Sequence, residues 1–315
     1  MLNRRYLRIK VMQALYAFIQ SYDKDINKGE KYLLNNIEKI YDLYIYLLLI
    51  VTEIKDHAEK TLNEAKNKKL PTQEDLNPTT RFIDNVIFKQ LAFNSQLKRE
   101  VEIRKLSWGD EAELIKKIFN AIKAGETYKN YMSSTDTAYK TQKEFITTIY
   151  YEHIADHELL NFFFEEKNIF WVDDLDFVNA MVMKTIESFN EQTSSATPLM
   201  KLYKDEADDM KFMIDLFRKT ILQNEESEKY ISEKTKNWEM DRIAMMDVLL
   251  MKMAITEILN FQNIPVKVSL NEYIEISKQY STPKSKLFIN GILDKLVYDF
   301  KANEQIKKTG RGLME

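Results

Sequence analysis

The sequence predicts an all-α protein, and three observations support this fold class. Glycine and proline, which interrupt helices, number only six and five among 315 residues. Through most of the chain, apolar residues recur at spacings of three and four, which is the period of one helix face. Hydrophobic residues make up 44% of the chain and provide the apolar surface for a core. The length allows one large or two ordinary domains.

The first predicted helix covers the opening of the chain. Its buried face consists of residues at spacings of three and four: Leu7, Val11, Ala14, Phe18 and Tyr22. A loop is expected over residues 23–29. Periodicity predicts further helices over residues 30–69, 81–104, 111–124, 140–166 and 173–191. The polar stretch 191–198 predicts a linker and a domain boundary.

The last third of the chain carries the clearest helix signals. Residues 208–222 are amphipathic, whereas residues 243–261 are apolar nearly all round and predict a buried central helix. Pro265 ends that helix, because the residue before proline avoids helical geometry. Ser269 and Glu272 then have the spacing of a capping box at the start of the next helix.

A final helix is predicted with Thr282 as N-cap and Pro283 at its first position. Gly291 lies inside this helix, where glycine costs about 1 kcal/mol relative to alanine. We therefore expect another helix to approach closely at Gly291. Residues after 303 are expected to form a frayed tail.

Composition excludes several classes of protein. The chain has no cysteine, which excludes disulfides, thiolate zinc sites and a cysteine nucleophile, and which fits a reducing compartment. The longest apolar run, residues 43–51, is far shorter than the roughly 20 residues of a membrane-spanning helix. The formal net charge is −3, so a nucleic-acid binder of this composition must concentrate its basic residues locally.

The sequence offers little for catalysis. His153 and His157 have the i, i+4 spacing of metal ligands, but a zincin needs glutamate after the first histidine and Ile154 stands there. The aspartates of the run at 173–176 fit the start of a helix, where the dipole favours negative charge. No glycine-rich phosphate loop is present. We expect no enzyme, no metal and no cofactor.

The opening of the chain is basic. Arg4, Arg5 and Arg8 lie on a strip beside the buried face of the first helix, and Lys10 adds a fourth positive charge. At about 100° per residue, Tyr16 lies only about 20° round the helix from Arg5. Arginines that neutralise phosphates and aromatics that stack on bases are typical of single-strand RNA binding. A solvated helix end, or a targeting segment, is the alternative interpretation of the same pattern.

Two blocks of sequence resemble a known family. "NRRYLRIKVMQALY" (residues 3–16) resembles the N-terminal helix of the NusB transcription antitermination family, R-R-x-x-R-x-x-x-x-Q-A-L-Y. "NIPVKVSLNEYIEISKQYSTPKSKLFINGILDKL" (residues 263–296) is similar to the family's V-P-x-K-V-A-I-N-E-A-x-E-L-A-K followed by K-F-V-N-G-V-L-D-K. Between them, "MDVLLMKMAITEIL" resembles the family's buried helix with its closing glutamate, here Glu257.

The resemblance implies an organisation of the chain. The family fold is all-helical, with two small packed bundles, and a typical member is roughly half this length. We therefore expect an RNA-binding helix at 1–22, a helical insertion or expanded first bundle at 23–200, a C-terminal bundle at 201–303 and the tail at 304–315.

The resemblance also implies a function. NusB-like proteins pair with NusE, a ribosomal protein, and bind the single-stranded boxA element of nascent ribosomal transcripts, which helps RNA polymerase resist termination in the cytoplasm. The implied RNA-binding residues are Arg4, Arg5, Arg8, Tyr16 and Phe288, and the basic opening of the chain adds Lys10 to this set. Asp247 matches an acidic position that contacts NusE.

Two alternatives remain open from the sequence. One is a helical interaction scaffold in which residues 23–200 bind a partner and RNA binding is vestigial. The other is an RNA-binding module related to those of ribosomal RNA methyltransferases, although the missing cysteine and glycine-rich loop argue against a complete enzyme of that kind.

Overall fold

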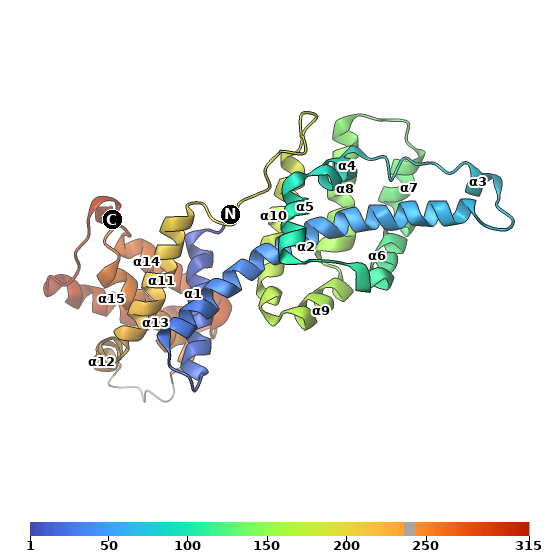
Figure 1. The fold of residues 1–315 in the computed structure, drawn as a ribbon. Coiled ribbons are helices and arrows are strands. Elements are labelled where there is room, and N and C mark those ends of the chain that lie inside the picture. Colours follow the sequence, from blue (N-terminus) through green and yellow to red (C-terminus); the bar gives the residue numbers. More distant parts are fainter. Residues whose placement is uncertain (236–242, 315) are drawn as a thin grey trace. The chain divides into compact units, whose positions relative to one another are not determined.

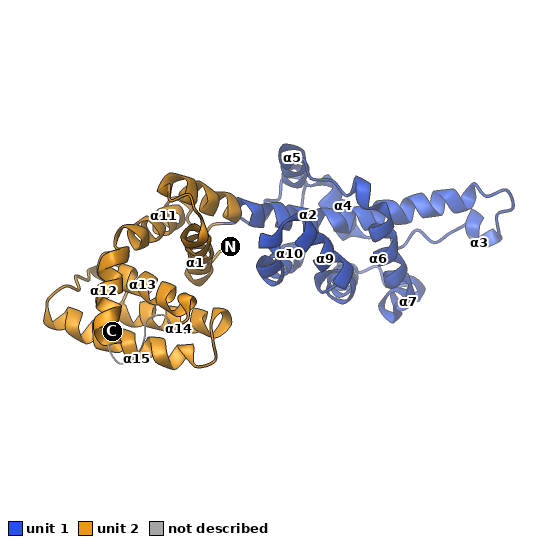
Figure 2. Cartoon of the chain, turned by 90° about the horizontal axis from the view of Figure 1, so that it is seen from below, with its two compact units in different colours: residues 1, 38–202 blue, residues 2–37, 203–315 orange. Residues whose placement is uncertain are grey.

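The computed structural model describes residues 1–235 and 243–314 and confirms the predicted all-α fold, with no strand among the described residues. The chain divides into two compact units, coloured separately in Figure 2. The terminal unit consists of Leu2–Ile37 and Tyr203–Glu315, and the middle unit consists of Met1 and Glu38–Leu202. The divisions therefore fall at 37/38 and 202/203, whereas the sequence predicted them at 22/23 and 200/201.

Helix α2, Ile26–Lys66, belongs to both units and is the long blue helix of Figure 1. It begins inside the predicted loop. The reason is local: the carboxylate of Asp25 accepts a hydrogen bond from the Asn27 N–H at 2.9 Å, which satisfies one of the unpaired N–H groups at the helix start. The apolar run 43–51 is buried within the middle unit, apart from the partly exposed Leu49.

The middle unit packs short helices around its part of α2. They are α3 (Gln73–Leu76), α4 (Val86–Phe93), α5 (Ser95–Arg104), α6 (Ala112–Ala124), α7 (Glu126–Ser133), α8 (Tyr139–Tyr150), α9 (Glu158–Lys167) and α10 (Leu175–Ser188). Short 3₁₀ turns precede α6 and α10, at Gly109–Glu111 and Ile169–Asp174.

Two of the helices predicted for this region are each divided into two. The helix expected over 81–104 breaks at Asn94, whose side chain accepts from the Leu97 N–H at 2.9 Å and so starts α5. The helix expected over 140–166 passes through a π-helical turn at Tyr151–Ala155 and begins again at Glu158.

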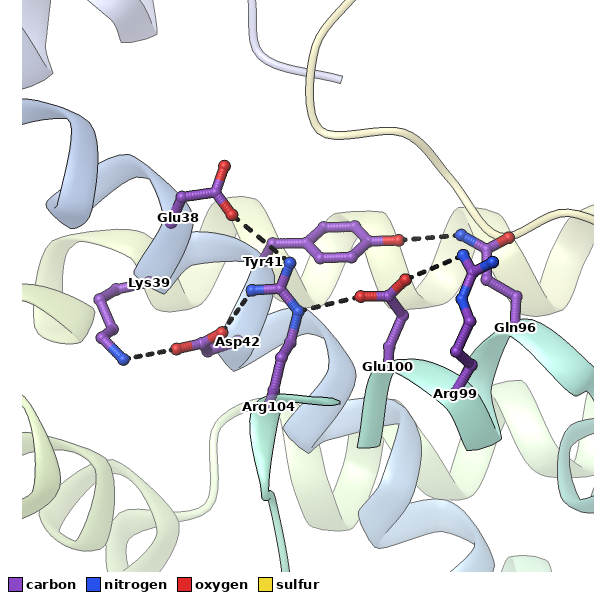
Figure 3. A network of polar contacts seen from close by, with 8 residues as sticks. All are labelled: Glu38, Lys39, Tyr41, Asp42, Gln96, Arg99, Glu100 and Arg104. Atoms are coloured by element: carbon purple, nitrogen blue, oxygen red, sulfur yellow. Dashed lines mark hydrogen bonds and ion pairs between the residues drawn. The ribbon is translucent and has the colours of Figure 1, made fainter. Parts of the chain in front are cut away.

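A polar network joins α5 to α2 in the middle unit (Figure 3). The Arg104 guanidinium binds the carboxylates of Asp42, Glu38 and Glu100, and lies 4.8 Å from the ring centroid of Tyr41. Burial lowers the pKa of Arg104, but the hydrogen bonds and charges of Asp42 and Glu100 outweigh burial, and the net pKa is raised. One half-buried cation therefore bridges three acids from two helices.

The polar stretch predicted as a linker is held against α5. The carbonyl of Ser195 accepts from the Ser95 N–H at 2.8 Å, and the carbonyl of Thr197 accepts from the Asn94 side chain at 2.8 Å. Residues 191–198 form turns, as their composition predicts.

The terminal unit packs α1 (Arg4–Gln20) against the C-terminal third of the chain. That third contains α11 (Glu206–Leu222), α12 (Asn224–Lys234), α13 (Met245–Asn260), α14 (Val266–Tyr280) and α15 (Ser285–Ala302). Helix α13 is the predicted central helix, and its residues from Leu249 to Ile258 are all buried. In α1, Leu7, Val11 and Ala14 are buried as predicted, whereas Tyr22 lies beyond the helix end and is fully exposed.

Several predictions of local structure in this unit are wrong. Helix α14 begins at Val266, so Ser269 is not a capping residue; its hydroxyl donates instead to the Glu257 carboxylate at 2.7 Å. Helix α15 begins at Ser285, two residues after the predicted Pro283. Gly291 has no neighbour within 4 Å of an added Cβ, so no helix approaches it closely.

Candidate nucleic-acid interface

The terminal unit is built around one buried carboxylate, that of Glu257 on α13. The Arg8 guanidinium donates to both of its oxygens, from Nε at 2.8 Å and from Nη2 at 2.7 Å. The hydroxyls of Ser269 and Tyr273 on α14 donate to the same carboxylate at 2.7 and 3.0 Å. Glu257 therefore ties α1, α13 and α14 together, and its charge is compensated by Arg8.

Burial shapes the electrostatics of this cluster. Desolvation lowers the pKa of Arg8, but the charge of Glu257 and the hydrogen bonds to it outweigh desolvation, so the net pKa is raised and the guanidinium stays charged. Burial and the negative charge of Glu257 raise the pKa of Tyr273, so its hydroxyl keeps the proton that it donates.

This placement corrects the predicted RNA-binding ridge. Arg8 is 2% exposed, and Lys10 is also buried. Arg8 neutralises Glu257, so its guanidinium is an internal structural cation in this conformation and presents no donor on the surface. The ridge was predicted from the periodicity of α1 alone, which cannot show a partner that lies 249 positions later in the chain.

Arg4 and Arg5 remain at the surface, and each is paired with an acid. Arg5 makes a two-pronged ion pair with Glu272 of α14, from Nε at 2.8 Å and Nη2 at 2.9 Å, and this hydrogen bonding raises its pKa. Arg4 pairs with Asp208 at the start of α11, and its Nη2 lies 3.5 Å from Asp209. An arginine has five N–H donors, so each retains donors that these pairs do not use.

Arg4 and Arg5 lie on a groove of about 1620 Å³ in the terminal unit. Its lining comes from α1, the start of α11, the turn between α13 and α14, and residues near the C-terminus. Seven basic and five acidic side chains line it. Without Arg8, whose charge is compensated by Glu257, the basic side chains still exceed the acidic ones by one, in a chain of net charge −3. The overall composition gives no sign of a basic region. The groove nevertheless gathers basic side chains at one place, as a nucleic-acid binder of this net charge requires.

Three of the five acidic residues of the groove stabilise the start of α11. Asp205 is the N-cap and accepts from the Asp208 N–H at 3.1 Å. The buried carboxylate of Asp209 accepts from the Lys204 and Asp205 N–H groups at 3.1 and 3.3 Å. Acids at a helix N-terminus interact favourably with the helix dipole. Their presence in a cationic groove therefore has a structural cause.

Two aromatic rings lie among the groove residues, each beside a cation. The Arg4 guanidinium is 4.4 Å from the ring centroid of Phe212, and the Lys219 ammonium is 5.4 Å from that of Phe261. The two rings meet edge to face at 5.3 Å. Phe212 is only 5% exposed, so its ring holds Arg4 and Phe261 in place, whereas the exposed cations of the groove favour a ligand that carries negative charge.

Sequence reasoning missed the cations of this groove that have no acid partner. Lys204, Lys211 and Arg311 are exposed, and their charged groups make no hydrogen bond or ion pair with another described residue. Their positions on α11, in the loop before it and near the chain end carry no shared motif. The packing of α1 against α11, and of the C-terminal segment on the turn between α13 and α14, brings them together with Arg5.

The remaining predicted site residues lie outside this groove. Tyr16 is 39% exposed and stands eleven residues beyond Arg5, about 16 Å along the helix axis. Phe288, near the start of α15, is half-buried. Asp247 is buried, and its two oxygens accept hydrogen bonds from the Ser281 and Ser285 hydroxyls, so it holds the turn between α14 and α15 and offers no free carboxylate to a partner.

Within the described residues, no group of three or more histidine, aspartate or glutamate side chains is arranged to hold a metal ion. In the same part of the chain, no helix has the length and apolarity needed to cross a lipid bilayer.

The all-α fold and the helices of the terminal unit define a helical protein of the kind that the two sequence blocks predicted. A family model described as the NusB family matches residues 175–298. The chain is 42% identical over 139 residues to the transcription antitermination protein NusB of Salinibacter ruber, covering 42% of this chain and 86% of that protein. The chain belongs to the NusB family.

Two further relatives carry the same description. The protein of Chloroherpeton thalassium is 40% identical over 104 residues, which are 33% of this chain and 49% of that protein. The protein of Natranaerobius thermophilus is 44% identical over 69 residues, which are 22% of this chain and 50% of that protein. No solved structure matches the chain.

Proposed function

We propose that this protein is an RNA-binding transcription antitermination factor. With NusE, it would bind boxA-like single-stranded RNA of nascent ribosomal transcripts and help RNA polymerase resist termination. The groove of the terminal unit carries the proposal, because it gathers exposed cations that suit the phosphates of this ligand. The relatives described as transcription antitermination proteins support it.

The groove changes the set of residues proposed to contact RNA. Arg4 and Arg5 stay in the set, whereas Arg8 and Lys10 leave it because they are buried. The groove adds the phosphate-binding candidates Lys204, Lys211, Lys219 and Arg311. Tyr16, in the last turns of α1, and Phe288, near the start of α15, remain candidates for stacking on bases.

The proposal predicts a salt dependence. For a single-stranded nucleic acid, the slope of log Kobs against log salt concentration becomes more negative by about 0.7 for each phosphate that the protein neutralises. The groove has six cations besides the buried Arg8, so contacts with all six would give a slope of about −4. A site limited to Arg4 and Arg5 would give about −1.4.

The test is a fluorescence-anisotropy titration of the full chain with a labelled boxA-like RNA from its own ribosomal transcripts, with and without its NusE. Lys204→Glu combined with Lys211→Glu should weaken binding about tenfold or more at low salt and reduce the slope by about 1.4. Neither side chain has a hydrogen-bond or ion-pair partner among the residues that the structure describes, so helicity should not change.

Lys229→Glu is the matched control, because Lys229 is an exposed lysine of α12 outside the groove. Equal affinity of the groove variant and the wild-type chain would refute the proposed interface. A wild-type chain that binds no boxA-like RNA, even with NusE, would refute the function and favour the interaction-scaffold alternative.

A further inference from the structure

We propose that residues 308–314 form a wall of the RNA groove and that Arg311 in this segment binds an RNA phosphate. The inference rests on the proposed function and extends it to a part of the chain that the sequence predicted to be frayed. No sequence motif of the resemblance includes this segment, because the matched blocks end near residue 300. The contacts that hold the segment in place carry the argument.

The segment docks on the turn between α13 and α14. The Lys308 ammonium donates to the Phe261 carbonyl at 2.9 Å, and the Thr309 N–H donates to the Gln262 carbonyl at 3.0 Å. Phe261 directly follows α13, where unpaired carbonyls and the helix dipole attract a cation. The Lys308 side chain therefore pairs with a carbonyl at the end of α13, and the segment is anchored by backbone as well as side chain.

Both glycines of the segment are required by its geometry. Gly310 has φ of +52°, in the left-handed region that favours glycine. A Cβ on Gly312 would lie 1.8 Å from the Gln262 carbonyl oxygen, which cannot move cheaply because it belongs to the backbone. The run "TGRGL" (residues 309–313) thus forms a specific 3₁₀ turn on the α13–α14 connection, which a flexible end would not need.

Docking places Arg311 between these two glycines, on the groove shared with Arg4, Arg5 and Lys211. Its guanidinium is exposed and makes no ion pair or hydrogen bond with the described residues. By contrast, Arg4 and Arg5 are each paired with an acid. An arginine that is fixed through its backbone and has no acid partner can give all its donors to a phosphate, with little competition and little loss of backbone entropy on binding.

The same geometry allows an opposite role, in which the segment covers the groove and hinders RNA. The two roles predict opposite changes in RNA affinity. If the segment is a wall that contributes Arg311, removing the guanidinium weakens RNA binding; if it is a cover, releasing the segment strengthens RNA binding. The exposed Arg311 guanidinium, which has no partner among the described residues, favours the first role, in which the segment is a wall of the groove.

The experiment compares Arg311→Ala with Lys307→Ala in the full chain, using the labelled boxA-like RNA. Lys307 is an exposed cation four residues away that does not line the groove. Arg311→Ala should weaken binding about three- to tenfold at low salt and reduce the salt slope by about 0.7, whereas Lys307→Ala should change neither. Equal effects of the two substitutions, or tighter binding by Arg311→Ala, would overturn the inference.

Gly312→Ala tests the docking itself. The Cβ should displace the segment from Gln262 and reproduce the loss seen with Arg311→Ala, and the double variant should lose no more than either single variant. Additive losses would contradict the inference. If the wild-type chain binds the RNA and Arg311→Ala binds it equally, only this inference fails; if the wild-type chain does not bind, the proposed function fails as well.

Discussion

Replacing Arg8 by methionine separates a structural arginine from an RNA-binding one. The substitution keeps an unbranched apolar stem but removes the guanidinium that donates twice to Glu257. The Glu257 carboxylate is fully buried and would retain only the hydroxyls of Ser269 and Tyr273. Removing one partner of a buried ion pair destabilises a protein by about 3–5 kcal/mol, because the other charge stays buried without compensation.

Arg5→Met is the matched control for this substitution. It removes the same group from the same helix, also in a two-pronged pair with a glutamate, but the Arg5 side chain is 45% exposed. Solvent screens such a pair, so a loss of at most about 1 kcal/mol is expected. The contrast between Arg5 and Arg8 therefore isolates burial as the cause.

Hydrogen–deuterium exchange of α13 peptides in the full chain is the assay, since it reports opening of the terminal unit alone. For Arg8→Met the protection should fall by about two to four powers of ten, at 1.4 kcal/mol per tenfold change. For Arg5→Met the fall should stay within about one power of ten. If Arg8→Met leaves exchange unchanged and abolishes RNA binding, the reasoning from burial is refuted and the predicted ridge is right.

Three further outcomes are expected. Gly291→Ala should raise the free energy of unfolding by about 1 kcal/mol, because the residue is helical and an added Cβ meets nothing; a lower melting temperature would contradict this. Arg104→Met should destabilise the middle unit by about 2–3 kcal/mol, since three acids lose their shared cation. The exposed Arg99, with Glu100 as its acid partner, gives the control Arg99→Met, expected within about 0.5 kcal/mol of wild type in exchange over α5. Burial lowers the pKa of Lys308 from 10.5 to about 8. The released segment therefore binds more protons than the docked one between these values, and docking should strengthen as pH rises from about 8 to 10.5. An NMR titration of Lys308 should show an inflection near pH 8 that returns toward 10.5 in Gly312→Ala; identical titrations would contradict the docking.

The fold could be predicted from the sequence where the signal is local. The buried face of α1 and the all-round apolarity of α13 follow from periodicity, because each helix carries its own pattern. The three-way junction around Glu257 could not be predicted in this way. Ser269 has the spacing of a capping residue, yet its hydroxyl is needed by a carboxylate on the preceding helix.

The residues of the candidate site could likewise be predicted only where the sequence signal is local. Arg4 and Arg5 were found from the first helix and the family motif. Lys204, Lys211 and Arg311 have no motif, and their common location depends on how α11 and the C-terminal segment pack. Gly312 explains why the sequence predicted a frayed tail for residues 308–314. Glycine in a polar end suggests flexibility, but here its missing Cβ is what allows the backbone to reach Gln262.

The three arginines at the start of α1 have different roles, and the role of each one depends on the acid with which it pairs. Arg8 meets a fully buried carboxylate and stabilises the junction of three helices. Arg4 and Arg5 meet acids at the groove edge, which orient their guanidinium groups and leave other donors free. Such pairing lowers the entropy lost when a phosphate binds, but it also lowers the net charge that attracts RNA. In the proposed RNA complex, the cations without an acid partner would supply that attraction. On this view the groove needs both kinds of cation: paired arginines for geometry and unpaired lysines and Arg311 for long-range charge.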